Sequence, residues 1–183
     1  AIFGALSVIS GAALYSAIQD SKVTSYVTEM TELSKAVESY MLDIGTDIPK
    51  RVGLSYIAEV EELLTSAATG WSGPYFTSEY NATSKGFKTR FSDPDSIYVV
   101  DVVDTDSALG GLVHSGSSPC ISSSTSCYYW VRAIRVDLAI AKAMDEKVDG
   151  VDNSEEGSLR YSFHSGTNKY FVWLRGPKTL SQY

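Results

Sequence analysis

The sequence predicts an α+β fold, with one long N-terminal α-helix packed against a small antiparallel β-sheet head. Residues 1–44 contain no proline and carry apolar side chains at helical spacing. The β-branched and aromatic runs typical of strands come later in the chain. Helices first and strands afterwards is an order typical of α+β folds. We therefore expect an N-terminal helix over residues 1–45 and a globular head over residues 46–183.

The first 19 residues contain no charged side chain. They are rich in small residues, and the pairs Ser7/Gly11 and Ala13/Ala17 have the spacing that lets apolar helices approach closely. The stretch is at the short end for a membrane span. It has neither a basic start nor a cleavage site, so it does not read as a complete signal peptide.

The helical pattern continues beyond Asp20 as an amphipathic helix, which Gly45 ends and Pro49 prevents from resuming. The residues expected to pack against the head are Val23, Tyr26, Val27, Met30, Leu33, Val37, Tyr40 and Met41. One continuous helix of this length measures roughly 65 Å, too long to be buried in a domain of this size. Its first half must therefore enter a membrane or contact other copies of the chain. The residues expected to make that contact are Ile2, Phe3, Gly4, Leu6, Val8, Ile9, Gly11, Leu14 and Ile18.

The remaining chain divides at clusters of turn residues. Asp137 is expected to cap a second helix as its N-cap residue. The expected elements are a short helix (54–67), a polar surface loop (77–96), a strand (96–104), a loop (108–126), a strand (127–136), a helix (137–150) and a hairpin of two strands (158–164 and 169–175).

Cys120 and Cys127 flank a short, serine-rich segment. In an oxidising compartment such a pair closes a disulfide that pins a loop to the following strand. The alternative is two reduced thiols in a cytosolic protein. Metal binding is disfavoured because no histidine or further cysteine lies at ligand spacing.

Three stretches resemble the type IV pilin and type II secretion pseudopilin family. "AIFGALSVIS" is similar to the N-terminal helix of these proteins, and an amphipathic half follows it, as in the family. "GWSGPYF" resembles the family's turn between helix and sheet, which here comprises Gly70, Trp71, Gly73, Pro74 and Tyr75. "AMDEKVDGVDNSEEGSLRYS" is similar to an acidic segment of some pilin-like proteins. The aromatic first residue and the nearby glutamate of the family have no counterpart, so about ten residues are expected ahead of Ala1.

The resemblance implies a structural subunit of an extracellular, type IV pilus-like filament with a pilin fold. Members of this family are anchored in the inner membrane, trimmed by a prepilin peptidase and polymerised by an assembly platform and ATPase. The expected partners are therefore copies of the same chain. The alternatives are a pseudopilin of a type II secretion system and a membrane-anchored binding domain that does not polymerise.

Other functional classes receive little support. The net charge is −7 and the basic residues are scattered, which argues against nucleic-acid binding. His114 and His164 lack a nucleophile-elbow pattern, so no catalytic residues and no enzymatic activity are expected.

The acidic run after residue 144 has two interpretations. Asp149, Asp152, Asn153 and Glu155 are candidate calcium ligands, because calcium prefers oxygen donors. Their spacing is not that of an EF-hand loop, and a solvated turn is the favoured interpretation, without a cofactor.

Overall fold

A single antiparallel sheet forms the centre of the head. The structure, a computed structural model, describes residues 2–53, 57–90, 92–103, 109–110, 120 and 126–180. Within these residues, six strands pair in the order β1-β2-β3-β4-β6-β5. In chain order the elements are α1 (Ile2–Ile44), the 3-10 helix η1 (Val60–Leu63), β1 (Tyr80–Asn81), β2 (Gly86–Thr89), β3 (Ser92–Val103), β4 (Cys127–Val136), α2 (Leu138–Asp149), β5 (Leu159–His164) and β6 (Lys169–Lys178).

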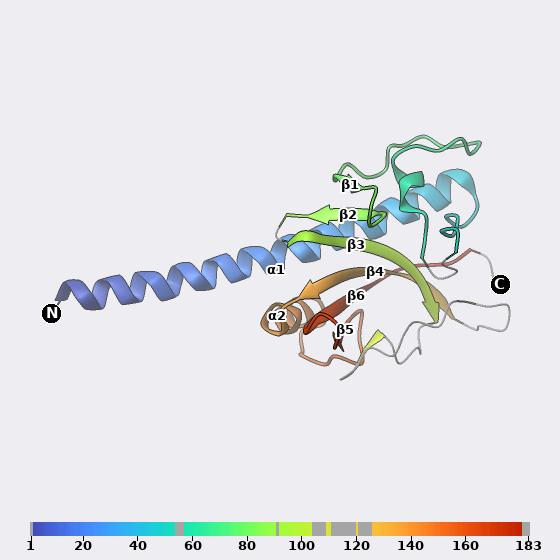
Figure 1. Ribbon diagram of the computed structural model, residues 1–183. Helices are drawn as coiled ribbons and strands as arrows, with labels where there is room; N and C mark the ends of the chain where they lie inside the picture. Colours follow the sequence, from blue (N-terminus) through green and yellow to red (C-terminus); the bar gives the residue numbers. More distant parts are fainter. Residues whose placement is uncertain are drawn as a thin grey trace.

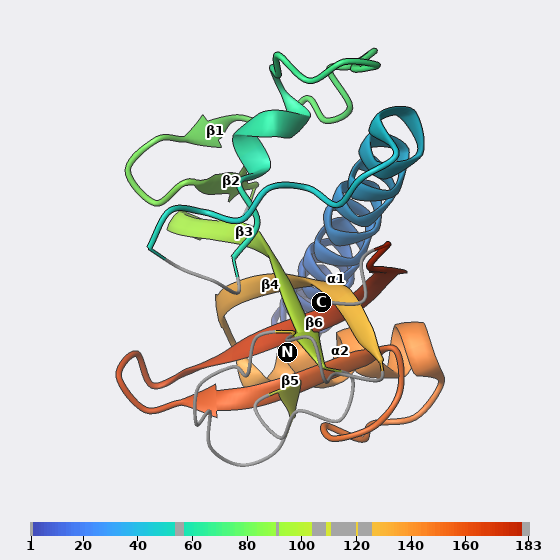
Figure 2. The same ribbon diagram turned by 90° about the vertical axis from the view of Figure 1, so that its right-hand side faces the viewer.

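Helix α1 lies on one face of this sheet and extends beyond it toward the N-terminus (Figure 1). Its C-terminal half contacts β4, β6 and α2. The view turned by 90° shows α1 and α2 beside the strands, and the two helices share one apolar core with that face of the sheet (Figure 2). The predicted α+β class, a long helix packed on an antiparallel sheet, is confirmed.

The predicted continuity of the first helix is also confirmed, since α1 runs from Ile2 to Ile44 without a break. Gly45 follows in the left-handed region, with a φ of 77°. Its N–H donates to the carbonyl of Met41 at 2.9 Å, which satisfies one of the last free carbonyls of the helix. Glycine reaches this conformation without the steric cost that a side chain would add.

The C-terminal elements match the expectations closely. Strand β4, helix α2 and the β5–β6 hairpin occupy the predicted stretches. Asp137 has the extended backbone of an N-cap residue, but its side chain makes no capping hydrogen bond. Its carboxylate instead forms an ion pair with the ammonium group of Lys169. The N-cap position was therefore predicted correctly, and the role of the side chain was not.

Two predicted elements are wrong. Residues 54–56 lie outside the described residues, and the rest of the expected helix 54–67 contains only the short turn η1. Ala58 pairs with Lys50 in a β-bridge, so the backbone before η1 is extended, and η1 alone buries Val60 and Leu63. Tertiary packing thus overrides the local helical preference.

The polar stretch 77–96 is the second error, because it contains β1, β2 and the start of β3 rather than a surface loop. Strand β1 is the edge of the sheet and β2 is its neighbour, and both have few apolar residues, as is common toward exposed sheet edges. Phe87 is the buried anchor of β2, and its ring packs against Phe76 with centroids 4.6 Å apart. A single apolar residue per strand leaves no alternating pattern to recognise.

The opposite face of the sheet carries a second, smaller apolar cluster, centred on Trp130 and Trp173. Phe171, Ile57 and Leu109 complete it. Most of the expected loop 108–126, including His114, lies outside the described residues.

Candidate functional site

The C-terminal half of α1 is held in the head by one apolar face. The side chains of Met30, Leu33 and Val37 are fully buried against the sheet. All the residues predicted to pack here contribute to the core: Val23, Tyr26, Met30, Leu33, Val37, Tyr40 and Met41 are buried, and Val27 is partly buried against the same cluster. Ala36, which the prediction omitted, is buried as well.

The preceding part of α1 has no such cover within the described residues. Leu14, Tyr15 and Ile18 have exposed fractions of 63%, 66% and 45%. Large apolar side chains grouped on a protruding helix are unusual for a monomeric soluble protein and mark an interaction surface. The side chains of the other predicted contact residues, Ile2, Phe3, Gly4, Leu6, Val8, Ile9 and Gly11, lie outside the described residues.

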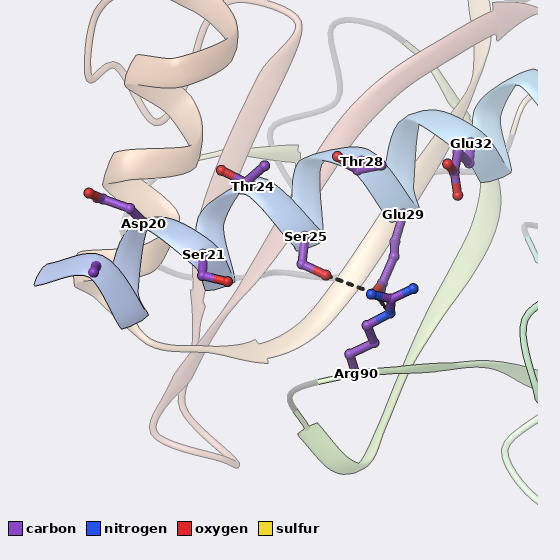
Figure 3. A pocket seen from close by; sticks show the side chains of 9 residues that line it. Asp20, Ser21, Thr24, Ser25, Thr28, Glu29, Glu32 and Arg90 are labelled. Atoms are coloured by element: carbon purple, nitrogen blue, oxygen red, sulfur yellow. Dashed lines mark hydrogen bonds and ion pairs between the residues drawn. The ribbon is translucent and has the colours of Figure 1, made fainter. Parts of the chain in front are cut away.

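A groove lies along α1 at the point where the helix enters the head (Figure 3). Its volume is about 640 Å³. One side of the helix forms the floor, and Arg90, from the connection between β2 and β3, forms a wall. The lining residues are Ala17, Asp20, Ser21, Thr24, Ser25, Thr28, Glu29, Glu32 and Arg90. We call this feature the α1 groove.

Glu29 is the most enclosed charged group of the α1 groove, and its side chain is 12% exposed. The Ser25 hydroxyl donates to its carboxylate at 3.0 Å, and Arg90 Nε lies 3.7 Å from the same oxygen. Burial raises the pKa of Glu29, while Ser25 and Arg90 act in the opposite direction. The groove therefore holds a carboxylate that is only partly compensated and would gain from a further cation.

A second groove of about 400 Å³ adjoins the first and shares Glu29, Glu32 and Arg90 with it. Its other wall is the β1–β2 region, where Lys88 forms an ion pair with Glu79. The charged side chains that α1 contributes to both grooves are all acidic. Sequence reasoning missed them because Arg90 and Lys88 are far from the helix in the chain, and only the sheet brings them beside it.

The turn that resembles the family motif closes over the C-terminal end of α1. A Cβ atom at Gly70 would lie 2.7 Å from the carbonyl oxygen of Asp43, so only glycine fits there. The Asp43 carboxylate accepts hydrogen bonds from Ser72 and Tyr75, and these two hydroxyls lower its pKa. Trp71 Nε1 donates to the carbonyl of Glu62 at 3.0 Å. Gly73 and Pro74 complete the turn with a cis peptide bond. The motif thus clamps the end of the helix.

The acidic residues after residue 144 fasten the connection between α2 and β5. Asp149 accepts the backbone N–H groups of Ser158 and Leu159 at 3.0 and 2.7 Å. Asp152 accepts from Lys142 and from the hydroxyl of Tyr161. The carboxylate oxygens of Asp149 and Asp152, two of the four candidate calcium ligands, are therefore hydrogen-bond acceptors within the loop.

Asn153 and Glu155 contribute a local turn, in which the Asn153 side chain accepts the N–H of Glu155 at 3.2 Å. Across the part of the chain that the structure describes, no group of three or more His, Cys, Asp or Glu side chains is arranged to hold a metal ion.

Asp145 is the most unusual member of this acidic region, because it is fully buried. One carboxylate oxygen accepts the N–H of Asn153 at 2.6 Å, and the other has no hydrogen-bond partner among the residues that the structure describes. Burial, together with the charges of Asp149 and Asp152, raises the pKa of Asp145 to about 6. A buried carboxylate in such surroundings costs stability when it is ionised.

The predicted disulfide between Cys120 and Cys127 is confirmed. Both cysteines are buried, and Cys127 is the first residue of β4. The bond therefore ties the preceding segment to the start of a central strand.

Arginine and aromatic side chains alternate on the sheet face opposite α1, an arrangement that sequence reasoning missed. Strand register places Tyr98, Arg132, Trp173 and Arg160 in one row across four strands. The Arg132 guanidinium lies 5.3 Å from the ring centroid of Tyr98 and 5.2 Å from that of Trp173. Such contacts stabilise the sheet. The row arises from register between distant strands, so no local pattern signals it.

The second histidine, His164, contacts neighbouring side chains of the β5–β6 hairpin. The ring of His164 stacks on Phe171 with centroids 4.5 Å apart, and its Nδ1 lies 3.0 Å from the Thr167 hydroxyl.

No protein-family model, curated protein sequence or solved structure matches this chain. A long helix packed on an antiparallel sheet, with a disulfide, is nevertheless roughly the architecture of a pilin. Among the residues described, no helix combines the length and the apolar character that crossing a membrane requires.

Proposed function

We propose that this chain is a structural subunit of an extracellular, type IV pilus-like filament, and that it polymerises through the N-terminal half of α1. The observation that carries the proposal is the exposure of Leu14, Tyr15 and Ile18 on a helix whose next turns are buried in the head. A helix that protrudes with apolar side chains needs an apolar partner. Further copies of the same helix would supply one.

The continuity of α1 supports a filament over a simple anchor. The helix runs from the protruding half into the buried half without a break. The protruding half is therefore held at a fixed angle to the head, whereas an anchored binding domain gains from a flexible linker. Contacts between different surfaces of successive copies repeat without closing and generate a helical filament.

The partners and the location follow from the family resemblance of the sequence and belong to the proposal. They are further copies of the chain, a prepilin peptidase and an assembly platform. The inner membrane holds the precursor, and the mature subunit lies in a filament outside the cell. The subunit has no catalytic role.

A pseudopilin of a type II secretion system is the second candidate, and the same exposed helix supports it. The two candidates predict different defects in cells that lack the protein. Deletion should abolish surface filaments seen by electron microscopy if the chain is a pilus subunit. Loss of protein secretion with no surface filaments in the wild type would favour the pseudopilin.

The assembly role is tested by making the exposed apolar side chains polar in the cells that produce the protein. The double substitution Leu14→Asn/Ile18→Asn should leave the subunit folded but remove it from sheared surface filaments. The matched control is Lys35→Asn/Glu38→Asn, which changes two exposed residues on the buried half of the helix. Mass spectrometry of the main filament band identifies the subunit.

Removal of residues 1–22 is the stronger form of the same experiment. It should yield a monomeric head that cannot enter filaments, with circular dichroism reporting whether the head is folded. Normal filaments built from the truncated chain, or from the asparagine double variant, would contradict the proposal.

A further inference from the structure

The turn between β1 and β2 contains a three-residue motif that the proposed function does not use. Asn81, Ala82 and Thr83 form the pattern Asn-X-Ser/Thr, with a residue other than proline in the middle. This pattern is the acceptor for asparagine-linked glycans in secreted proteins. The sequence has two other asparagines, Asn153 and Asn168, and neither has a serine or threonine two positions later. Asn81 is therefore the only asparagine of this sequence that fits the acceptor pattern.

The motif lies on a part of the head that a modifying enzyme can reach. Asn81 is the last residue of β1 and is half-buried, whereas Ala82 and Thr83 are exposed. Strand β1 is an edge of the six-stranded sheet that the structure describes. Figure 1 shows β1 and β2 on the head, apart from the protruding end of α1. A glycan on this turn would therefore not cover the exposed apolar side chains of α1.

The hydrogen bonds of the turn show which atom of the Asn81 amide remains accessible to chemistry. Oδ1 accepts the N–H of Thr83 at 3.0 Å and the N–H of Ser84 at 3.2 Å. Two backbone donors at one atom identify it as the oxygen, because the amide nitrogen cannot accept. Nδ2, the other branch of the amide, makes no hydrogen bond to the residues that the structure describes. The nitrogen that a glycosyl transfer modifies is therefore not needed to hold the turn.

The turn is also fixed by contacts outside the motif. The N–H of Lys85 donates to the carbonyl of Asn81 at 2.6 Å and closes the turn. Arg51 Nη1 donates to the carbonyl of Ser84 at 3.2 Å and ties the turn to the segment that follows α1. The acceptor asparagine thus lies on a preformed surface turn. Neither its Nδ2 nor the hydroxyl of Thr83 contributes to these contacts.

The disulfide gives an independent indication of the compartment. Cys120 and Cys127 are joined, and disulfides form and persist in oxidising compartments outside the cytosol. Asparagine-linked glycans are typical of secreted chains, which pass through such compartments. The inference therefore needs an exported chain but does not depend on the assembly of a filament.

We propose that Asn81 is the acceptor of an asparagine-linked oligosaccharide. Nδ2 attacks the anomeric carbon of an oligosaccharide that a lipid pyrophosphate carries. The N–C bond forms as the C–O bond to the pyrophosphate breaks, and the lipid pyrophosphate leaves. A base of the glycosyltransferase takes the proton that Nδ2 loses, so the step is balanced without an oxidant or a reductant. The hydroxyl of Thr83 is the group by which the transferase recognises the site.

A glycan at this position would also protect the edge of the sheet. The unpaired N–H and C=O groups of an edge strand can pair with a strand of another chain. Strand β1 is such an edge, and it ends at Asn81. A bulky, hydrophilic oligosaccharide at its end opposes edge-to-edge pairing.

Peptide mass spectrometry of the protein isolated from the cells that produce it tests the proposal. Trypsin cleaves after lysine and arginine, so residues 52–85 form one peptide that contains Asn81. In the wild type this peptide should carry the added mass of an oligosaccharide, and fragmentation should place that mass on Asn81. A wild-type peptide with only the mass of its amino acids would overturn the proposal.

Three substitutions distinguish a glycan on the amide from one on a hydroxyl. Asn81→Asp keeps an oxygen that accepts the N–H groups of Thr83 and Ser84 but removes the amide nitrogen, so it should lose the glycan completely. Thr83→Val has nearly the same shape as threonine without the hydroxyl and should lose the glycan as well. Thr83→Ser, the matched control, retains a hydroxyl and should keep it.

Two results with these variants would overturn the proposal. A glycan that persists on the 52–85 peptide of Asn81→Asp would lie on a serine or threonine hydroxyl instead. Equal glycosylation of Thr83→Val and Thr83→Ser would show that the motif is not what the transferase recognises. Circular dichroism of the purified variants checks that the head is folded in each case.

Discussion

The two halves of α1 share one backbone and one helical repeat but have opposite surroundings. Leu33 in the second half is fully buried, whereas Leu14 in the first half is 63% exposed. Below the head, the helix presents apolar side chains to its surroundings. Within the head, the same kind of side chain points into the core, and polar residues line the opposite side.

This difference shows that apolar periodicity indicates which side chains need to be buried. It does not indicate whether the same chain or another molecule covers them. The second half of the helix has its partner within the chain. In the proposed function the first half takes its partner from outside the chain, so that the same residue type would contribute to folding in one half and to association in the other.

The largest expected effect comes from one substitution made in both halves. Leu33→Ala should lower the free energy of unfolding by about 3 kcal/mol, because it leaves a cavity in a packed core. Leu14→Ala should change it by less than about 0.5 kcal/mol and should weaken filament formation instead. Urea denaturation of purified protein in detergent measures the first quantity, and the yield of sheared filaments measures the second. Equal losses of stability would show that the first half also packs within the monomer.

The second largest effect is expected in the region of α2, because this helix contacts α1 and supports its buried half. Asp149→Asn should destabilise the head by about 1–3 kcal/mol, because the carboxylate accepts two backbone N–H groups of the α2–β5 connection. Thermal unfolding followed by circular dichroism gives the shift. Glu146→Asn is the control, one residue that faces solvent on the same helix. An unchanged melting temperature for Asp149→Asn would mean that the connection does not support the helix pair.

A substitution of Asp145 should change the stability of the head in the opposite direction. Its pKa is raised from 3.8 to about 6, so the folded state binds the proton more tightly than the unfolded state does. Ionisation therefore costs stability above pH 6, and stability increases as the pH falls from 6 to 4. Asp145→Asn should stabilise the head by about 1 kcal/mol at pH 7 and flatten this pH dependence. A variant that is less stable than the wild type at pH 7 would contradict the assignment.

The smallest effect is expected at the clamp over the end of α1. The hydroxyls of Ser72 and Tyr75 lower the pKa of Asp43, so the stabilisation they provide is present above the ordinary value of 3.8. It is lost as the pH falls below that value, through the lowered pKa of the folded state. Tyr75→Phe should reduce this loss slightly in melting curves recorded between pH 5 and pH 2. Asp43→Asn should remove the contribution of this group altogether, and an unchanged pH profile in both variants would argue against the clamp.

Elements with a strong local pattern could be predicted from the sequence. Helix α1, strand β4, helix α2 and the β5–β6 hairpin fall where periodicity and turn residues indicated. Strands β1 and β2 could not be predicted, because β2 has a single buried aromatic residue, Phe87, in a polar stretch. The expected helix at 54–67 failed because a β-bridge between Lys50 and Ala58 fixes the backbone there, and no local pattern reports such a pairing.

The candidate site likewise has one part that could be predicted from the sequence and one part that could not. Leu14 and Ile18 could be named from composition and spacing, since their chemistry is local. The α1 groove could not, because Arg90 reaches Glu29 only after the β2–β3 connection has folded against the helix. The alternating row around Arg132 likewise depends on the register of β3, β4 and β6.

The unbroken course of α1 also has a mechanical consequence. In a filament held together by this helix, a pulling force would run along the helix axis through every subunit, and the sheet would hang beside the line of tension. The protruding turns have no sheet to brace them, so they would unwind first under load. A helical residue spans 1.5 Å and an extended one about 3.4 Å, so this segment could lengthen roughly twofold while the heads stay folded. Optical-tweezer stretching of single filaments should then show reversible extension, and a filament that snaps without lengthening would rule it out.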